Sequence, residues 1–289
     1  LAQCPKIEKE LPVPAFENRV TAELLEFFQS LSFSSLVRRF ENLVADGEKA
    51  EAQDTSSDEL DIRYHLIKTK DQLTALKEKI EKEKYFAFDL ETTALEFFKA
   101  EIVGLSVSFK DEGYYIPLQY SIFDGKDIDF GFEDVKNQLS PLFADPGIKK
   151  TGHNLKFDIL HLKHKGIETA GAWDDSMVMS YLLHPNRRAH NLKELTLEVL
   201  NYKQVEYAQL TGKGKSQKKL IDVDMEQVAR YCIDDSYLTL KLADNLEPSL
   251  KEKELDKLYR GLEMPLVNIL MLMEYAGVRV DVDFLKDAA

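Results

Sequence analysis

The sequence predicts an α/β fold in which a sheet is covered by helices. Two observations lead to this expectation: strand-like segments come first, between residues 64 and 152, and the pattern after them is mostly helical. The length supports it, because 289 residues are enough for one large domain or two moderate ones.

The segments before this domain predict a helical tail and a linker. Apolar residues between Thr21 and Leu43 have the spacing of two short helices that break near Ser32–Ser35. Residues 46–59 are polar and charged, which is typical of a linker. We therefore expect four regions: a small helical N-terminal segment over 1–45, a linker over 46–59, the main domain over 60–254 and a truncated domain over 255–289.

Short segments in the main domain predict its strands and helices. The expected strands are Tyr64–Ile67, Tyr85–Leu90, Glu101–Phe109, Gly113–Leu118 and Lys149–Gly152. The expected helices are Lys70–Lys84, Phe132–Phe143, Leu155–Lys165, Asp175–Leu183, Asn191–Leu200, Asp224–Leu250 and Leu255–Tyr275. The chain opens on Leu1 and stops within a helix-like pattern that begins at Asp283, so we expect a fragment of a longer protein.

Charge and cysteine content narrow the classes of function. The net charge of −13 argues against a broad nucleic-acid surface, because neutralising phosphates requires Lys and Arg. A local basic loop around Lys213 and Lys215 remains compatible with DNA, and its alternative reading is a solvated loop. Cys4 and Cys232 suggest no disulfide framework, and no apolar stretch has the length of a membrane span. We expect a cytoplasmic protein.

The segment Phe86–Thr92 carries the first candidate site. An apolar strand ends there in Asp89 and Glu91, which point to the same side because side chains alternate along a strand. Two neighbouring carboxylates repel each other, and a hard divalent cation with oxygen ligands would relieve that repulsion. The Asp-x-Glu pattern alone is weak, since it recurs at Asp224–Glu226, where Asp224 is expected to be a helix N-cap.

Two helical segments supply further polar pairs. Asn154 and Asp158 are four residues apart, as are Tyr231 and Asp235, so each pair shares one face of its helix. Taken alone, Asp158 fits a plain surface residue and Tyr231 an ordinary half-buried tyrosine. Asp234 is turned about 100° from Asp235 and should face solvent or support the site from behind. Asp175 predicts an N-cap for the helix after it.

In chain order, these three motifs resemble those of 3′–5′ exonucleases with four acidic residues. The tyrosine in the third motif is similar to the subclass found in proofreading domains. Over residues 60–289 the chain resembles the bacterial DNA polymerase I family, and residues 17–45 resemble the end of that family's 5′-nuclease region. The stretches that carry this resemblance are Gly152–Asp158, Asp175–Leu183, Tyr207 with Gly214–Gln217, Ala229–Tyr231 and Leu262–Val267.

The resemblance implies a ribonuclease H-like fold, with a mixed sheet flanked by helices, and two divalent metal ions, Mg²⁺ or Mn²⁺. Asp89, Glu91 and Asp235 would hold one ion. Asp89 and Asp158 would hold the second, partly through water. Tyr231 and Glu91 would orient the attacking water. This assignment agrees with the chemistry, because oxygen ligands suit such metals and a metal pair suits phosphodiester hydrolysis.

The resemblance also implies how a substrate would be held. Leu95 would wedge between the last bases, and Thr92 and Asn154 would contact the terminal nucleotide. Four further residues belong to the implied DNA contacts: Tyr207 in place of the family's phenylalanine, His153 where glutamine is common, and Lys213 and Lys215.

The implied activity is metal-dependent release of 5′-nucleotides from single-stranded DNA 3′ ends. The partner would be the rest of the polymerase chain, and the protein is expected to be a monomer. Two alternatives stay open. One is a catalytically silent module that binds a displaced strand and braces the polymerase. The other is a related exoribonuclease, against which the polymerase-like helix at Leu262–Val267 argues.

Overall fold

The computed structural model describes residues 60–120, 125–171, 173–212, 214 and 217–288, together with Leu24, Phe27 and Phe28. The chain divides into two compact units, Leu1–Ser56 and Ser57–Ala289, and the second contains the fold considered below. The linker expected over 46–59 and the two basic residues Lys213 and Lys215 lie outside the described residues. So does the N-terminal helical tail, except for three helical positions within it.

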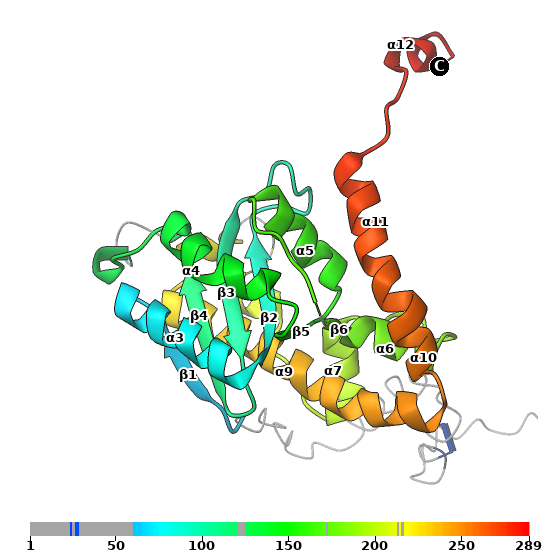
Figure 1. The fold of residues 1–289 in the computed structure, drawn as a ribbon, viewed down its shortest axis with the longest axis horizontal. Coiled ribbons are helices and arrows are strands. Elements are labelled where there is room, and N and C mark those ends of the chain that lie inside the picture. Colours follow the sequence, from blue (N-terminus) through cyan, green and yellow to red (C-terminus); the bar gives the residue numbers. More distant parts are fainter. Residues whose placement is uncertain are drawn as a thin grey trace, which may run out of the picture. The chain divides into compact units, whose positions relative to one another are not determined.

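A six-stranded mixed sheet forms the centre of the second unit, with one strand more than the five expected from the sequence (Figure 1). Its strands lie in the order β1-β4-β3-β2-β5-β6. Strands β2, β3 and β4 pair antiparallel, whereas β1, β5 and β6 join the sheet by parallel pairing. The strands are β1 Arg63–Leu66, β2 Tyr85–Thr92, β3 Ile102–Ser108, β4 Glu112–Pro117, β5 Lys149–Gly152 and β6 Trp173–Asp175.

Helices make up most of the remainder. They are α3 Lys70–Glu83, α4 Phe132–Ala144, α5 Leu155–His164, α6 Ser176–Leu183, α7 Leu192–Leu200, α8 Tyr207–Thr211, α9 Met225–Glu252, α10 Asp256–Leu258, α11 Met264–Ala276 and α12 Val282–Asp287. Short turns of other helical types are η1 Gly125–Asp127, η3 Leu220–Asp222 and η4 Tyr259–Glu263, the last of them π-helical. None of the helices in the described ranges has the length and apolarity needed to cross a bilayer.

Both faces of the sheet are covered. On one face, Phe86 and Phe88 of β2 pack in the same core cluster as Leu73 of α3 and Phe143 of α4. On the other face, Val103 and Tyr115 pack with apolar residues of α9, and Figure 1 shows α3 and α4 on the side of the sheet opposite α9. Because both faces are buried, β3 is buried along its whole length.

Helix α9 is the element that shapes the site. Its N-cap Asp224 accepts a hydrogen bond from the backbone N–H of Gln227 at 3.1 Å, which confirms the predicted cap. The helix runs for 28 residues and contacts β2, β3 and β4, so its buried face crosses the middle of the sheet. This crossing brings Asp235 over β2.

The structure differs from the sequence prediction in several short elements. Strand β6 and helix α8 were not predicted, since three and five residues are too few to show a period. The helix expected over Leu255–Tyr275 is interrupted, because η4 winds as a π-helical turn between α10 and α11. Such turns occur often next to functional sites.

Candidate metal centre

Strand β2 presents two carboxylates on the face that α9 covers. Phe86, Phe88 and Leu90 point into the core beneath α3 and α4, so the alternate residues Asp89 and Glu91 point the other way. A register shift follows between Glu91, which pairs with Gly104 of β3, and Thr92, which pairs with Ile102. Such irregularities bend a strand and re-aim side chains, and here one lies directly beside the carboxylates.

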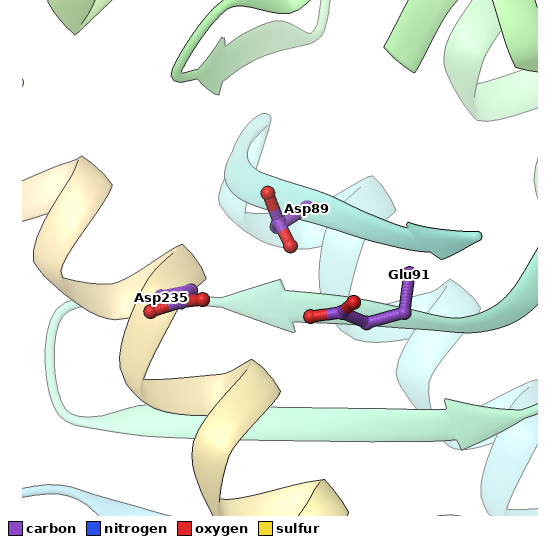
Figure 2. Close-up of side chains that lie close together, drawn as sticks. All are labelled: Asp89, Glu91 and Asp235. Atoms are coloured by element: carbon purple, nitrogen blue, oxygen red, sulfur yellow. The ribbon is translucent and has the colours of Figure 1, made fainter. Parts of the chain in front are cut away.

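Asp235 of α9 completes a group of three carboxylates. One oxygen from each of Asp89, Glu91 and Asp235 lies within 4.8 Å of the others. Figure 2 shows their side chains turned toward one shared space between β2 and α9. All three are half-buried, so the space is open to solvent at one side.

The electrostatics of this group favour a bound cation. Burial raises the pKa of Asp89 to about 7. Burial, followed by the charge of Asp89, raises the pKa of Glu91 to about 8, and burial with both neighbouring charges raises the pKa of Asp235 well above its usual range. Among the described residues, no lysine or arginine forms an ion pair with these three carboxylates. A divalent cation with oxygen ligands would supply the missing positive charge.

Asp158 stands beside this group rather than within it. It lies in the first turn of α5 and is only 2% exposed, so its reading as a plain surface residue is wrong. Burial and then the charge of Asp89 raise the pKa of Asp158, while a hydrogen bond from the backbone N–H of Leu90 lowers it. Asp158 on α5 is therefore a fourth carboxylate whose pKa is affected by the charge of Asp89.

The start of α5 is held by a carboxylate from another strand. Asp175 accepts hydrogen bonds from the backbone N–H groups of Asn154 at 3.1 Å and Leu155 at 2.8 Å. It also accepts one from Met177 at 2.8 Å, which confirms the predicted cap of α6. Asn154 has a left-handed backbone with φ of 62°, a conformation that asparagine tolerates, and its side chain does not cap α5.

Two tyrosines lie next to the carboxylates. Tyr231 precedes Asp235 by one turn of α9, and burial followed by the charge of Asp235 raises the pKa of its hydroxyl. The hydroxyl therefore keeps its proton at neutral pH. Tyr207 opens α8 with its ring 6.3 Å from that of Tyr231, and it is 42% exposed.

The other described residues that were expected to contact substrate lie at the end of β2 and on two connections. Leu95 follows β2 and is 82% exposed, and the Thr92 hydroxyl donates to the carbonyl of Ala94 at 2.9 Å. His153 lies between β5 and α5, with Nδ1 2.8 Å from Ser176 Oγ and with Nε2 buried. Burial lowers the pKa of His153 to about 4, so its ring is neutral.

Three neighbours of the site were not predicted. Gln204 Nε2 donates to Asp235 Oδ1 at 2.6 Å, and the thiol of Cys232 lies 3.7 Å from Glu91 Oε1. The hydroxyl of Tyr64 donates to Asp234 at 2.6 Å, so the half-buried carboxylate of Asp234 is tied to β1. Each contact joins elements far apart in the chain, and no local spacing indicates such a pairing.

A comparison with known protein families finds a match that covers the residues of this site. A family model described as a 3′–5′ exonuclease matches residues 64–251, which include all four carboxylates. The chain is 29% identical over 301 residues to DNA polymerase I of Borreliella burgdorferi, covering 97% of this chain and 32% of that protein. It is 33% identical to DNA polymerase I of Rhizobium leguminosarum, covering 68% of this chain and 21% of that protein. The chain thus spans about a third or less of these relatives.

Solved structures share the fold. The POL domain of Pol1 from M. smegmatis, in complex with DNA primer-template and dNTP, is similar with a TM-score of 0.59 at 22% identity. That match covers 75% of this chain and 33% of the other. NrnC of Brucella melitensis with bound Mg²⁺ is similar with a TM-score of 0.54 at 20% identity, covering 76% and 98%. These likenesses confirm the predicted ribonuclease H-like fold.

Proposed function

This chain belongs to the 3′–5′ exonuclease family, and from that premise we propose that it degrades single-stranded DNA from its 3′ end, releasing 5′-nucleotides. The observation that carries the proposal is the convergence of Asp89, Glu91 and Asp235 on one space, with Asp158 beside Asp89. In a longer DNA polymerase I this activity would proofread, because a mismatched terminus frays more readily and reaches the site as a single strand.

The donor set fits two divalent ions, which we propose to be Mg²⁺ or Mn²⁺. Asp89, Glu91 and Asp235 would hold one ion, and Asp89 with Asp158 the other. Bound there, the ions would acidify a water molecule and neutralise charge on the phosphate. The fit rests on two observations: the donors are all carboxylate oxygens, and burial raises their pKa values while no described lysine or arginine forms an ion pair with them.

The side chains around the ions would position the nucleophile. Tyr231 keeps its hydroxyl proton, so it can donate one hydrogen bond to a water and accept another, but it is a poor base. Glu91 is the carboxylate on β2 nearest the strand end, where it can accept a hydrogen bond from the same water. Together they would hold the water in line with the phosphodiester bond while the leaving 3′ oxygen departs.

The 3′ end would be gripped by exposed side chains around the carboxylates. The exposed Leu95 would wedge between the last bases, and the exposed ring of Tyr207 offers a surface on which a base can stack. Thr92 and Asn154 would contact the last nucleotide, while Lys213 and Lys215 would approach the phosphates. His153 would act through the position of its loop, because both of its ring nitrogens face protein.

We further propose that residues 255–289 begin a polymerase domain, after an exonuclease domain over 60–254, a linker over 46–59 and the end of a 5′-nuclease region over 1–45. The rest of such a chain would be the partner of this domain, which would otherwise act as a monomer in the bacterial cytoplasm. The support is the identity to DNA polymerase I sequences, each of which extends well beyond this match.

The proposal is tested with a 5′-labelled single-stranded oligonucleotide, digested with Mg²⁺, with Mn²⁺ or with EDTA. We expect stepwise shortening from the 3′ end with either metal, none with EDTA, and slower shortening of the same strand in a blunt duplex. An RNA of the same sequence is the comparison for an exoribonuclease. No metal-dependent shortening would favour the silent bracing module instead.

A further inference from the structure

The connection between α7 and α8 contains one buried residue, and that residue is polar. Residues 201–206 are exposed or half-exposed except for Gln204, which is 7% exposed. A buried amide is costly unless both of its ends are hydrogen-bonded. The hydrogen-bond partners of Gln204 therefore explain why this polar side chain is buried.

Both ends of the Gln204 amide have a partner. Nε2 donates to Asp235 Oδ1 at 2.6 Å, and Oε1 lies 3.2 Å from the hydroxyl of Thr196, whose one proton is shared with the backbone carbonyl of Lys193 at 3.0 Å. Thr196 lies on α7 and is fully buried, so the anchor is part of the packed interior. This orientation suits the ionised Asp235 that would bind a cation, because an ionised carboxylate only accepts hydrogen bonds and the opposite orientation would set two acceptors against each other.

The donor is neutral, which suits a carboxylate that binds a cation. A lysine or arginine at this place would neutralise Asp235 and oppose the entry of a divalent ion. An amide N–H orients the carboxylate without removing its charge. The bond uses part of the capacity of Oδ1, and the remaining lone pairs of the carboxylate stay available toward Asp89 and Glu91.

We propose that Gln204 is a positioning residue for the metal centre. It holds the Asp235 carboxylate in the orientation that meets Asp89 and Glu91, and it thereby strengthens the binding of divalent cations. For catalysis this inference rests on the proposed exonuclease function, but its effect on cation binding does not. Partners behind a metal ligand typically contribute about 10–100-fold in metal affinity or activity.

The test is Gln204→Met, which keeps the length and bulk of the side chain and removes the donor. The readout is Mn²⁺ affinity, measured without DNA by titration calorimetry and by the electron paramagnetic resonance of free Mn²⁺. We expect affinity to fall by about 10–100-fold. We also expect the exonuclease rate to fall at low Mn²⁺ and to recover in part as Mn²⁺ is raised.

Three further variants make the test specific. Gln209→Met is the matched control, because Gln209 lies on α8 and accepts from the backbone N–H of Glu206 without touching the carboxylates, so Mn²⁺ affinity should be unchanged. Thr196→Val removes the anchor of the amide and should lower affinity by less than Gln204→Met does. Gln204→Asn, one methylene shorter, cannot reach Asp235 and serves if the Met variant does not fold.

The outcomes separate this inference from the proposed function. The positioning role is overturned if the Gln204 variants bind Mn²⁺ with parental affinity while being as stable as the parent in EDTA, judged by the temperature of unfolding. This holds even if the parent degrades DNA. A parent that binds no Mn²⁺ overturns it as well. A parent that binds Mn²⁺ but does not degrade DNA refutes the exonuclease, while a loss of affinity in the variants still upholds the inference.

Discussion

Asp175 and Leu155 are linked by a hydrogen bond of 2.8 Å from the backbone N–H of Leu155 to the carboxylate, across 20 positions of sequence. The same carboxylate caps α6 through Met177. The hydroxyl of Tyr259 in η4 accepts from the backbone N–H of Asp175 at 2.8 Å. The buried carboxylate of Asp175 therefore accepts hydrogen bonds from the first backbone N–H groups of two helices, α5 and α6. The first turn of α5 contains Asp158, so the position of Asp158 depends on this contact.

This relationship predicts that Asp175→Asn lowers the free energy of unfolding by about 1–3 kcal/mol, the cost of leaving buried hydrogen-bonding groups unmatched. Asparagine has one acceptor oxygen, and its NH₂ group would face backbone N–H groups. Urea unfolding in EDTA measures the change. Asp224→Asn is the control, because asparagine is as good an N-cap at that exposed position, and its effect should stay within about 0.5 kcal/mol. Equal losses in the two variants would contradict the role of Asp175 at α5.

Asp158→Asn should abolish most exonuclease activity without harming the fold. We expect the rate to fall by about 100-fold or more, because the variant removes a carboxylate that we propose to hold the second ion, partly through water, and even an outer partner of a metal site typically contributes about 10–100-fold. The metal-free variant should be at least as stable as the parent, because a buried uncompensated carboxylate is removed. Digestion of the labelled oligonucleotide measures the rate.

Asp234→Asn is the matched control for this experiment. Asp234 is next to Asp235 in sequence, but its carboxylate accepts a hydrogen bond from the Tyr64 hydroxyl and is not one of the three carboxylates that converge. Its exonuclease rate should stay close to that of the parent. A large loss there, or a parental rate for Asp158→Asn, would refute the assignment of the fourth carboxylate.

The metal-free protein should lose stability as the pH rises. The folded-state pKa values of Asp89 and Glu91 lie near 7 and 8, above those of an unfolded chain near 4. Between these limits the folded state binds more protons than the unfolded state, so the free energy of unfolding falls with pH. The full contribution is present below about pH 4 and is lost as pH passes through the folded-state values.

Urea unfolding between pH 5 and 8 in EDTA measures this slope, which should reach at most about 1.4 kcal/mol per pH unit for each proton released. With Mn²⁺ at 100 times its dissociation constant, the protein should gain about 2.7 kcal/mol at neutral pH. The slope should then flatten or reverse, because the cation binds the deprotonated carboxylates. A stability in EDTA that rises over this range would show that the group is balanced by positive charge.

The ring of Tyr207 should contribute to binding single-stranded DNA, whereas its hydroxyl should not. Tyr207→Ala removes a 42% exposed ring and should cost about 1–3 kcal/mol, the usual value for one stacked base. Tyr207→Phe keeps the ring and should bind like the parent. Fluorescence anisotropy with a labelled oligonucleotide in Ca²⁺ or EDTA measures affinity without degradation. Equal losses for both variants would indicate that the hydroxyl, not stacking, makes the contact.

Local pattern was sufficient for the long elements of the fold. The apolar run before Asp89 predicted β2, and the spacing after Asp224 predicted α9 within a few residues of its end at Glu252. It was insufficient for β6, which is only three residues long, and for η4, a five-residue π-helical turn within a segment that was expected to be one continuous helix. Short or irregular elements depend on the partners against which they pack.

The sequence by itself determined which side chains can act together within one element. Asp89 and Glu91 share a face because strands alternate, and Tyr231 and Asp235 share one because helices repeat every few residues. Only the tertiary structure decided that α9 crosses β2, that Asp158 is buried and that Gln204 bonds to Asp235. The physical reason is that backbone geometry sets distances between residues close in the chain, whereas distances between elements are set by how their apolar faces pack.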